Sequence, residues 1–376
     1  MDSNNWQYRL YEEFIILKKM IVSRGKFQPL KVCKIKEKKY VDHINELLVP
    51  RGNSKSLTVL DLFAGCGGLG LGFEACGFRT VGYEIKEDYC ATYSNNLNGE
   101  CITANLTQDT EVPDADVIIG GPPCQPFSVG GKQNGLKDSR DGFPAFISAV
   151  EKINPDIWMF ENVRGLLYRN KWYFEEIKER LESFDYIVDS KLLNAKRYGV
   201  PQNRERVIVV GHKGSFEFPE EEIEDVTAGE ALQELATQIP EDVRWVTPNM
   251  DVYIKKYEKA SQCINPRDLH LDRPSRTLTC RNLAGATGDM HRIRLEDGKR
   301  RMLTVREAAR LQSFPDWFEF EGTLSSQFYQ IGNAVPPLFA YKLALSVKEY
   351  LESDLRYDAN EMDGMRFRAP QQMSLF

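Results

Sequence analysis

The sequence predicts an α/β fold, a doubly wound and mostly parallel sheet with a smaller inserted domain. From residue 56 onward, short apolar runs alternate with longer stretches of helical periodicity. A glycine-rich segment directly follows the first apolar run, as in the first βα turn of nucleotide-binding sheets. Between residues 213 and 298 the alternation stops, and afterwards it resumes. The smaller domain therefore interrupts the larger one.

Each element follows from this pattern. The predicted strands are residues 58–62, 80–84, 116–120, 156–160, 186–192 and 206–211. The predicted helices include residues 172–184, 304–312 and 337–351. The predicted organisation is a basic N-terminal extension (1–55), a cofactor-binding catalytic domain (56–212), a smaller domain (213–298), a return to the catalytic domain (299–352) and a tail (353–376).

Composition excludes several classes of protein. The 376 residues are 42% hydrophobic, which is enough to fill a core. No run of about eighteen apolar residues and no signal-peptide pattern is present, so we expect a cytoplasmic protein without a membrane span. The eight cysteines are scattered singly without a C-x-x-C pair, so we predict no metal site and no disulfide framework.

Charge is unevenly distributed. The net charge is −6, but residues 1–55 carry 12 Lys/Arg against 6 Asp/Glu, and the remaining chain carries 37 against 49. A basic arm on an acidic body suits local contact with phosphates, and a solvated basic surface explains it equally well.

The glycine-rich segment follows the predicted strand 58–62. Phe63, Gly65 and Gly67 lie in it, and Glu84 ends the next strand about twenty residues later. Glycines let a ligand approach the backbone, and an acid at that distance binds ribose hydroxyls. NAD, FAD and S-adenosylmethionine (SAM) all fit such a loop. The spacing is not G-x-G-x-x-G, which favours SAM, a cofactor without a pyrophosphate.

Cys124 lies in a loop that follows the predicted strand 116–120. Three prolines surround it, Pro122, Pro123 and Pro126. They restrict the backbone and hold the thiol in one direction, at the edge of the sheet where α/β sites form. The other seven cysteines are consistent with small buried side chains. We therefore predict that Cys124 is a nucleophile.

The sequence GGPPCQPFS at residues 120–128 resembles the nucleophile loop of the cytosine-C5 DNA methyltransferase family, in its bacterial or phage restriction–modification form. Further motifs of that family follow its order. They are the SAM loop at 61–70, the acid motif at 161–163, the Q-x-R-x-R motif at 202–206, the return helix at 301–315 and the last motif at 332–337. The resemblance covers roughly residues 56–350 and implies a SAM-dependent, Rossmann-like methyltransferase fold.

This resemblance implies methyl transfer from SAM to carbon 5 of a cytosine flipped out of double-stranded DNA. Carbon 5 is a weak nucleophile, so Cys124 would first add to carbon 6. Glu161 would stabilise the ring at N3, and Arg206 would hold the cytosine O2. Arg204 would lie near the cysteine loop and a phosphate.

The resemblance also assigns binding residues. For SAM they are Phe63, Gly65, Gly67, Leu69, Glu84, Asn105, Pro122 and Asn333. Asn105 departs from the aspartate that many relatives carry, although an amide oxygen still accepts a hydrogen bond. For DNA they are Gln125, Ser128, Arg276, Thr277, Leu278 and Arg281. Residues 213–298 would form the target-recognition domain, in which Arg281, Asn282, Arg292 and Arg294 read either base edges or phosphates.

Three alternatives remain open on the sequence alone. They are a tRNA cytosine-C5 methyltransferase, a catalytically inactive DNA-binding regulator on the same fold, and a nicotinamide oxidoreductase. The C-terminal sequence Gln372-Met373-Ser374-Leu375-Phe376 resembles peptides that dock on the bacterial sliding clamp, and a tail packed on its own domain is the other interpretation. We expect the enzyme to act as a monomer.

Overall fold

The computed structural model of the protein describes residues 39–53, 55–123, 141–241, 243–260, 267–285 and 289–353. The chain from Lys39 onward forms one compact unit. The predicted nucleophile Cys124, its neighbours Gln125 and Ser128, most of the basic extension and the clamp-like tail lie outside the described residues.

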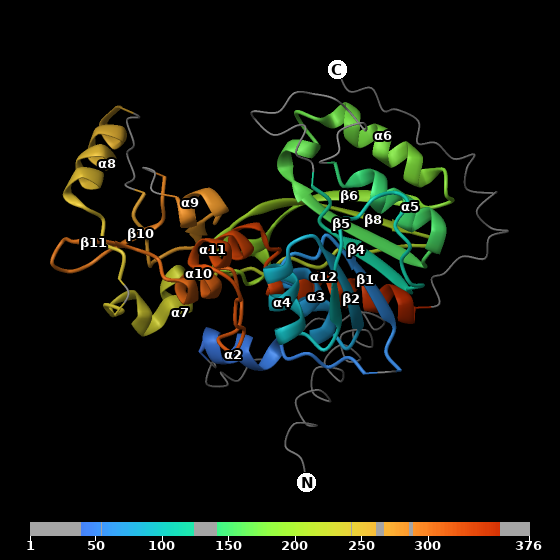
Figure 1. Ribbon diagram of the computed structural model, residues 1–376, viewed down its shortest axis with the longest axis horizontal. Coiled ribbons are helices and arrows are strands. Elements are labelled where there is room, and N and C mark those ends of the chain that lie inside the picture. The colour runs from blue at the N-terminus through green and yellow to red at the C-terminus, as the bar shows by residue number, and fades with distance from the viewer. Residues whose placement is uncertain are drawn as a thin grey trace, which may run out of the picture. The chain divides into compact units, whose positions relative to one another are not determined.

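A seven-stranded sheet organises the described chain, in the order β3-β2-β1-β4-β5-β8-β6 (Figure 1). Its strands are β1 (Thr58–Leu62), β2 (Arg79–Glu84), β3 (Glu100–Thr103), β4 (Val117–Gly120), β5 (Ile157–Val163), β6 (Ile187–Asn194) and β8 (Glu205–His212). The pairs among β1 to β5 are parallel, whereas β8 runs antiparallel to both β5 and β6. A mostly parallel sheet places the ends of β1, β4 and β5 along one edge.

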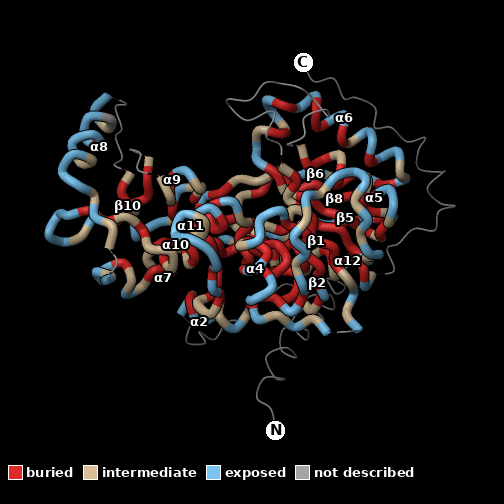
Figure 2. The backbone as a smooth tube through the Cα atoms, viewed as in Figure 1, coloured by how far each residue is buried: buried red, intermediate tan, exposed pale blue. Residues whose placement is uncertain are grey.

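Alternate residues of the central strands fill two different cores. Val59, Val117 and Ile157 belong to one cluster, whereas their neighbours Ile118 and Trp158 belong to another. Side chains along a strand alternate between the two faces, so both faces of this sheet are buried. Figure 2 shows the same concentration of buried residues in the strands.

Helices cover each face. The longer helices are α3 (Gly68–Ala75), α4 (Glu87–Asn96), α5 (Phe143–Ile153), α6 (Lys171–Glu182), α11 (Leu324–Asn333) and α12 (Pro337–Glu352). Apolar residues of α3 and α12 belong to one core, and those of α5 and α6 to the other (Figure 1). The approach of α3 to α12 is close, since a Cβ on Gly72 would lie 2.4 Å from the backbone nitrogen of Tyr341.

Short elements and the 13-residue helix α8 fill the chain between β8 and α11. They are α7 (Ala228–Leu232), α8 (Pro248–Ala260), β9 (Ser275–Arg276), α9 (Cys280–Ala284), β10 (Arg292–Arg294), β11 (Arg300–Met302) and α10 (Val305–Leu311). The remaining elements are α2 (Tyr40–Leu47), β7 (Gln202–Asn203) and the 3₁₀ turns 164–166, 195–198 and 233–236. Capping boxes begin α7, α9 and α10, from Thr227, Thr279 and Thr304 respectively.

The predicted fold class is confirmed, with local differences. Strand β3 was not predicted because it is an edge strand with little buried surface and no apolar alternation. Strand β5 continues to Val163, so Glu161 lies inside the strand rather than after it. Helix α2 falls within the predicted N-terminal extension, yet Ile44 and Leu48 pack into a core of the sheet.

Strand β11 lies just beyond the predicted boundary at residue 298. It pairs antiparallel with β10 through a turn in which Gly298 has φ +81° and donates to the carbonyl of Leu295. Asp297-Gly298 is a sequence signal for such a turn. The hairpin keeps residues 300–302 with the preceding region. Within the described chain, no helix combines the length and apolar character needed to cross a membrane.

Candidate active site

The glycine loop after β1 forms an open cradle. Phe63 and Gly65 both have positive φ, +59° and +58°, which is costly for phenylalanine and free for glycine. A Cβ added at Gly65 would meet no atom within 4 Å. Gly121, at the end of the neighbouring strand β4, likewise faces open space. The backbone at these two positions is therefore accessible to a bound molecule.

Glu84 faces this cradle from the end of β2. Its Oε2 accepts a hydrogen bond from the Gly65 amide at 2.9 Å, and its Oε1 accepts from the amides of Ile85 and Lys86 at 3.0 Å each. A carboxylate oxygen has two lone pairs, so Oε2 can still accept a ligand hydroxyl, whereas Oε1 already accepts two hydrogen bonds. This geometry suits one hydroxyl of a ribose.

Asp61 lies beneath the loop and is 1% exposed. Burial raises its pKa well above the ordinary value, the charge of Glu84 adds to the increase, and the Gly70 amide partly opposes it. A Cβ on Gly70 would lie 3.0 Å from the Asp61 carboxyl. The protonated form of Asp61 is thus favoured, which limits repulsion between the two acids.

Hydrogen bonds hold the described residues that precede Cys124. The buried Asn162 amide donates from Nδ2 to the carbonyl of Pro122 at 3.0 Å. The Gly142 amide donates to the carbonyl of Pro123 at 3.1 Å. Pro122 is therefore bonded to strand β5, and Pro123 to the residue that precedes α5.

Glu161 and Arg206 meet on the neighbouring strands β5 and β8. Arg206 pairs with Val163, two residues from Glu161, so the two side chains are diagonal neighbours on one face. Arg206 Nε lies 2.6 Å from Glu161 Oε1, at an angle that makes the contact an ion pair rather than a hydrogen bond. Both side chains are about nine-tenths buried, at 13% and 12% exposed. The structure thus brings these two predicted residues together.

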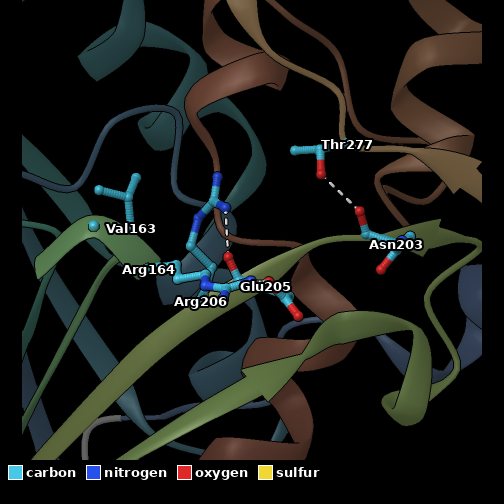
Figure 3. A pocket seen from close by; sticks show the side chains of 7 residues that line it. Val163, Arg164, Asn203, Glu205, Arg206 and Thr277 are labelled. Carbon is cyan, nitrogen blue, oxygen red and sulfur yellow. Dashed lines mark hydrogen bonds and ion pairs between the residues drawn. The ribbon is translucent and has the colours of Figure 1, made fainter. Parts of the chain in front are cut away.

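A cavity of about 390 Å³ opens beside Arg206 (Figure 3). Residues from three segments line it: Val163, Arg164, Gly165, Asn203, Glu205, Arg206 and Thr277. This volume is in the range of small-molecule sites. Arg164 pairs with Glu205 at 2.9 Å at this cavity, and Thr277 Oγ1 donates to the Asn203 carbonyl at 2.6 Å.

Two side chains form hydrogen bonds with the backbone of Thr277. Its carbonyl accepts hydrogen bonds from Asn282 Nδ2 at 2.9 Å and from a ring nitrogen of His291 at 3.4 Å. Burial lowers the pKa of His291 to about 3, and the charge of Arg276 contributes in the same direction. His291 is therefore neutral at physiological pH.

Arg204 occupies a different environment from the expected one. It is 1% exposed, and its guanidinium donates to the carbonyls of Leu278, Gly332 and Ala334 at 2.8 to 3.3 Å. Burial lowers its pKa well below the ordinary value, Arg206 lowers it further, and Glu161 opposes this. Instead of facing a phosphate, Arg204 joins β8 to two distant segments.

Buried glutamines complete this junction. Gln202 accepts from the Leu278 amide at 2.9 Å and donates to the Gln312 side chain. Gln312 donates to the carbonyls of Ile331 and Ala334 at 3.0 and 2.7 Å. The loop before β8, the end of α10 and the end of α11 are thus connected to the segment that carries Thr277.

The other predicted residues have mixed positions. Leu69 and Leu278 are buried in the core, whereas Asn105, Asn333 and Arg281 are exposed. Arg276 pairs with Asp289 at 3.1 Å. Arg292, a candidate for DNA contact, is fully buried and paired with Asp268 and Glu258, and Asn282 is 4% exposed. Neither side chain is presented to DNA.

Sequence reasoning did not single out several residues that the site uses. Asn162, Asn203 and Arg164 contact or line the site. Asn162 immediately follows Glu161 in the acid motif, so its position was the one available signal. The contribution of the other two depends on which strands become neighbours.

The fold and the site together define an α/β protein with an open glycine loop after β1 and a largely buried Glu161–Arg206 pair on β5 and β8. The family model described as C-5 cytosine-specific DNA methylase matches residues 57–349. Type II methyltransferase M.AplI of Arthrospira platensis is 54% identical over 318 residues, with 84% of this chain and 92% of that protein covered. Type II methyltransferase M1.HphI of Haemophilus parahaemolyticus is 35% identical, with coverage of 78% and 87%.

Solved structures share the fold. The Entamoeba histolytica methyltransferase EhMeth aligns with a TM-score of 0.63 at 18% identity, over 80% of this chain and all of that one. A Spodoptera frugiperda DNMT2 variant aligns with a TM-score of 0.60 at 18% identity, over 79% and 100%. The chain belongs to the C-5 cytosine-specific DNA methylase family and is a DNA (cytosine-5)-methyltransferase.

Proposed function

We propose that the protein transfers the methyl group of SAM to carbon 5 of a flipped-out cytosine in a specific duplex DNA sequence, through a covalent adduct of Cys124. The observation that carries the proposal is the meeting of Glu161 and Arg206 beside the anchored loop of Pro122 and Pro123. These two side chains converge from different strands, next to a cavity that is large enough for a base.

The chain's own residues account for each step. Cys124, as a thiolate, attacks carbon 6 of the cytosine, and the resulting negative charge develops at N3. Glu161 would hydrogen-bond or protonate N3, and Arg206 would donate to O2. Carbon 5 then accepts the electrophilic methyl group that SAM supplies when bound. Transfer of the carbon 5 proton to a base, a group that we do not assign to a residue, then breaks the bond from carbon 6 to sulfur, releases Cys124 as a thiolate and restores the aromatic ring.

The cradle fits SAM. Glu84 Oε2 would accept a ribose hydroxyl, and the open backbone at Gly65 and Gly121 would contact the remainder of the cofactor. Phe63 is partly exposed at the same turn. The absence of a G-x-G-x-x-G spacing agrees with a cofactor that lacks a pyrophosphate.

DNA contact would come from the region of residues 213–298, acting as a target-recognition domain. Thr277 is the residue of this region that lines the cavity. The Thr277 carbonyl accepts hydrogen bonds from Asn282 and His291. Arg276, Arg281 and Arg294 are predicted contacts that are exposed. Arg204 serves in this proposal as a positioning residue.

The test is transfer of labelled methyl from SAM to unmethylated duplex DNA, run beside tRNA, with the product bases identified. We expect 5-methylcytosine in DNA, abolished by Cys124→Ser and retained by Cys101→Ser, a half-buried cysteine on the edge strand β3. DNA containing 5-fluorocytosine should form a denaturant-stable complex with the wild type alone, because fluorine cannot leave as a proton does. Label in tRNA would support the rival substrate, and absence of label with intact DNA binding would support an inactive regulator.

Docking of residues 372–376 on the sliding clamp stays a prediction. Clamp binding by the full chain, lost on deletion of these five residues, is the expected result. Binding that persists after the deletion would contradict it.

A further inference from the structure

Residues 163–172, which we call the basic–aromatic segment, run from the end of β5 into α6 (Figure 1). The segment contains Arg164, Arg169 and Lys171 but no acid, in a chain whose net charge is −6. Tyr168 and Trp172 are 60% and 51% exposed. Large exposed aromatic side chains next to cations are typical of nucleic-acid-binding surfaces.

The fold does not require these exposed side chains for its own packing. Leu166 and Tyr173 anchor the segment and are fully buried. The Asn170 amide closes the turn by donating to the Gly165 carbonyl at 3.1 Å. A surface turn could therefore be built with small polar residues in place of Tyr168 and Trp172.

The segment begins at the cavity described above. Val163, which is 52% exposed, lines it together with Arg164. The Arg164 guanidinium lies 4.8 Å from the centre of the Tyr168 ring. The same guanidinium pairs with Glu205 at 2.9 Å, and both of these side chains line the cavity (Figure 3). Arg169 and Lys171 form no ion pair with another described residue, so their charges stay available.

We propose that the basic–aromatic segment binds the DNA strand beside the flipped cytosine. Arg169 and Lys171 contact its phosphates, while Tyr168 and Trp172 pack against a neighbouring base or sugar that extrusion has unstacked. This proposal rests on the proposed function, because it takes the adjacent cavity as the cytosine site. The occupant is DNA, since Arg169 and Lys171, which form no ion pair with a described residue, complement a polyanion and the segment is continuous with that cavity.

The experiment compares two double variants with the wild type, Tyr168→Ala/Trp172→Ala and Arg169→Gln/Lys171→Gln. The control is Lys178→Gln, which removes an exposed cation further along the same helix, where it pairs with Glu182. The measurements are KM for unmethylated plasmid DNA, KM for SAM, and Kd for a 30-bp duplex at several salt concentrations. Melting temperature checks that each variant folds.

We expect the aromatic variant to raise KM for DNA about fivefold or more, with KM for SAM unchanged. The cation variant should reduce the magnitude of the slope of log Kd against log salt by up to about 1.8, or about 0.9 for each lost phosphate contact. The control should change neither quantity. If melting falls in a double variant, Trp172→Phe and Arg169→Lys replace it and should restore near-wild-type values.

Unchanged KM for DNA and an unchanged salt slope in both variants, with the wild type active, would overturn the inference and leave the proposed function intact. A change in self-association in place of DNA affinity would also overturn it, by assigning the segment to a protein interface. A wild type that neither binds nor methylates DNA would overturn the proposed function, and this inference with it.

Discussion

Replacement of Arg204 by methionine separates a positioning role from contact with a phosphate. The substitution keeps an apolar side chain of similar length and removes every donor. In the wild type these donors reach the carbonyls of Leu278, Gly332 and Ala334. Ala334 would keep its second hydrogen bond, from Gln312 at 2.7 Å. The carbonyls of Leu278 and Gly332 would lose the Arg204 donor.

The structure sets the expected magnitude. Each buried carbonyl that loses its partner costs about 1 to 3 kcal/mol, so two of them cost about 2 to 6 kcal/mol. The variant regains the cost of burying the guanidinium, a cost that is visible in the lowered pKa of Arg204. We therefore expect the free energy of unfolding to fall by about 2 to 4 kcal/mol.

Urea unfolding at pH 7 measures this change, and the salt dependence of DNA binding provides the second readout. Arg206→Met is the matched control, because Arg206 lies two residues further along the chain, on β8, and contacts Glu161. We expect Arg204→Met to lose stability while keeping the wild-type salt slope, and Arg206→Met to lose methyl transfer. A slope reduced by about 0.9 with unchanged stability would refute the positioning role and restore the phosphate contact.

Three further predictions concern the cradle, the acid and the buried histidine. Gly65→Ala should weaken SAM binding at least tenfold. The control is Gly77→Ala, because Gly77 also has positive φ and open space around it; this variant should lose a similar free energy of unfolding and keep the wild-type affinity for SAM. Equal SAM affinities of the two variants, measured by calorimetry, would contradict binding of SAM at Gly65. Glu161→Gln should lower kcat about 10²- to 10⁴-fold in steady-state methyl transfer at unchanged SAM affinity, and retention of full kcat would exclude proton transfer at N3. Burial lowers the pKa of His291 from 6.5 to about 3, so only the unfolded state gains this proton as the pH falls below 6.5. The free energy of unfolding should therefore fall by about 2 kcal/mol between pH 7 and pH 5. In urea unfolding, the His291→Leu variant should lack this pH-dependent loss of stability. The same pH dependence in the variant and the wild type would disprove the role of His291.

The sequence predicted those features that local pattern determines. Alternating apolar residues marked six of the seven strands of the main sheet, and the motifs alone assigned Glu161 and Arg206 to one site, where the two side chains form an ion pair. Strand ends carry such side chains to one edge of an α/β sheet, so their proximity follows from topology. The edge strand β3 escaped prediction because its pairing depends on backbone hydrogen bonds rather than on apolar side chains.

The sequence pattern did not predict how deeply each side chain of a motif is buried. Arg204 and Arg206 belong to the same motif, yet Arg204 points into a junction built from residues more than seventy positions away. Leu278 and Thr277 are adjacent, but only Thr277 reaches the cavity. Such differences depend on which distant segment covers each side chain, and no local window of sequence contains that information.

The close packing of α3 on α12 has a consequence for biosynthesis. Leu69 and Phe73 of α3 share a core with Leu338 and Phe339 of α12. These partners are separated by about 270 residues, which a ribosome adds in about 15 to 50 s. During this interval the nascent glycine loop lies beside uncovered apolar surface, exposed to aggregation and to chaperones. Folding of the cofactor cradle is therefore completed late in translation, and a chain truncated before Pro337 should be recovered as an aggregate.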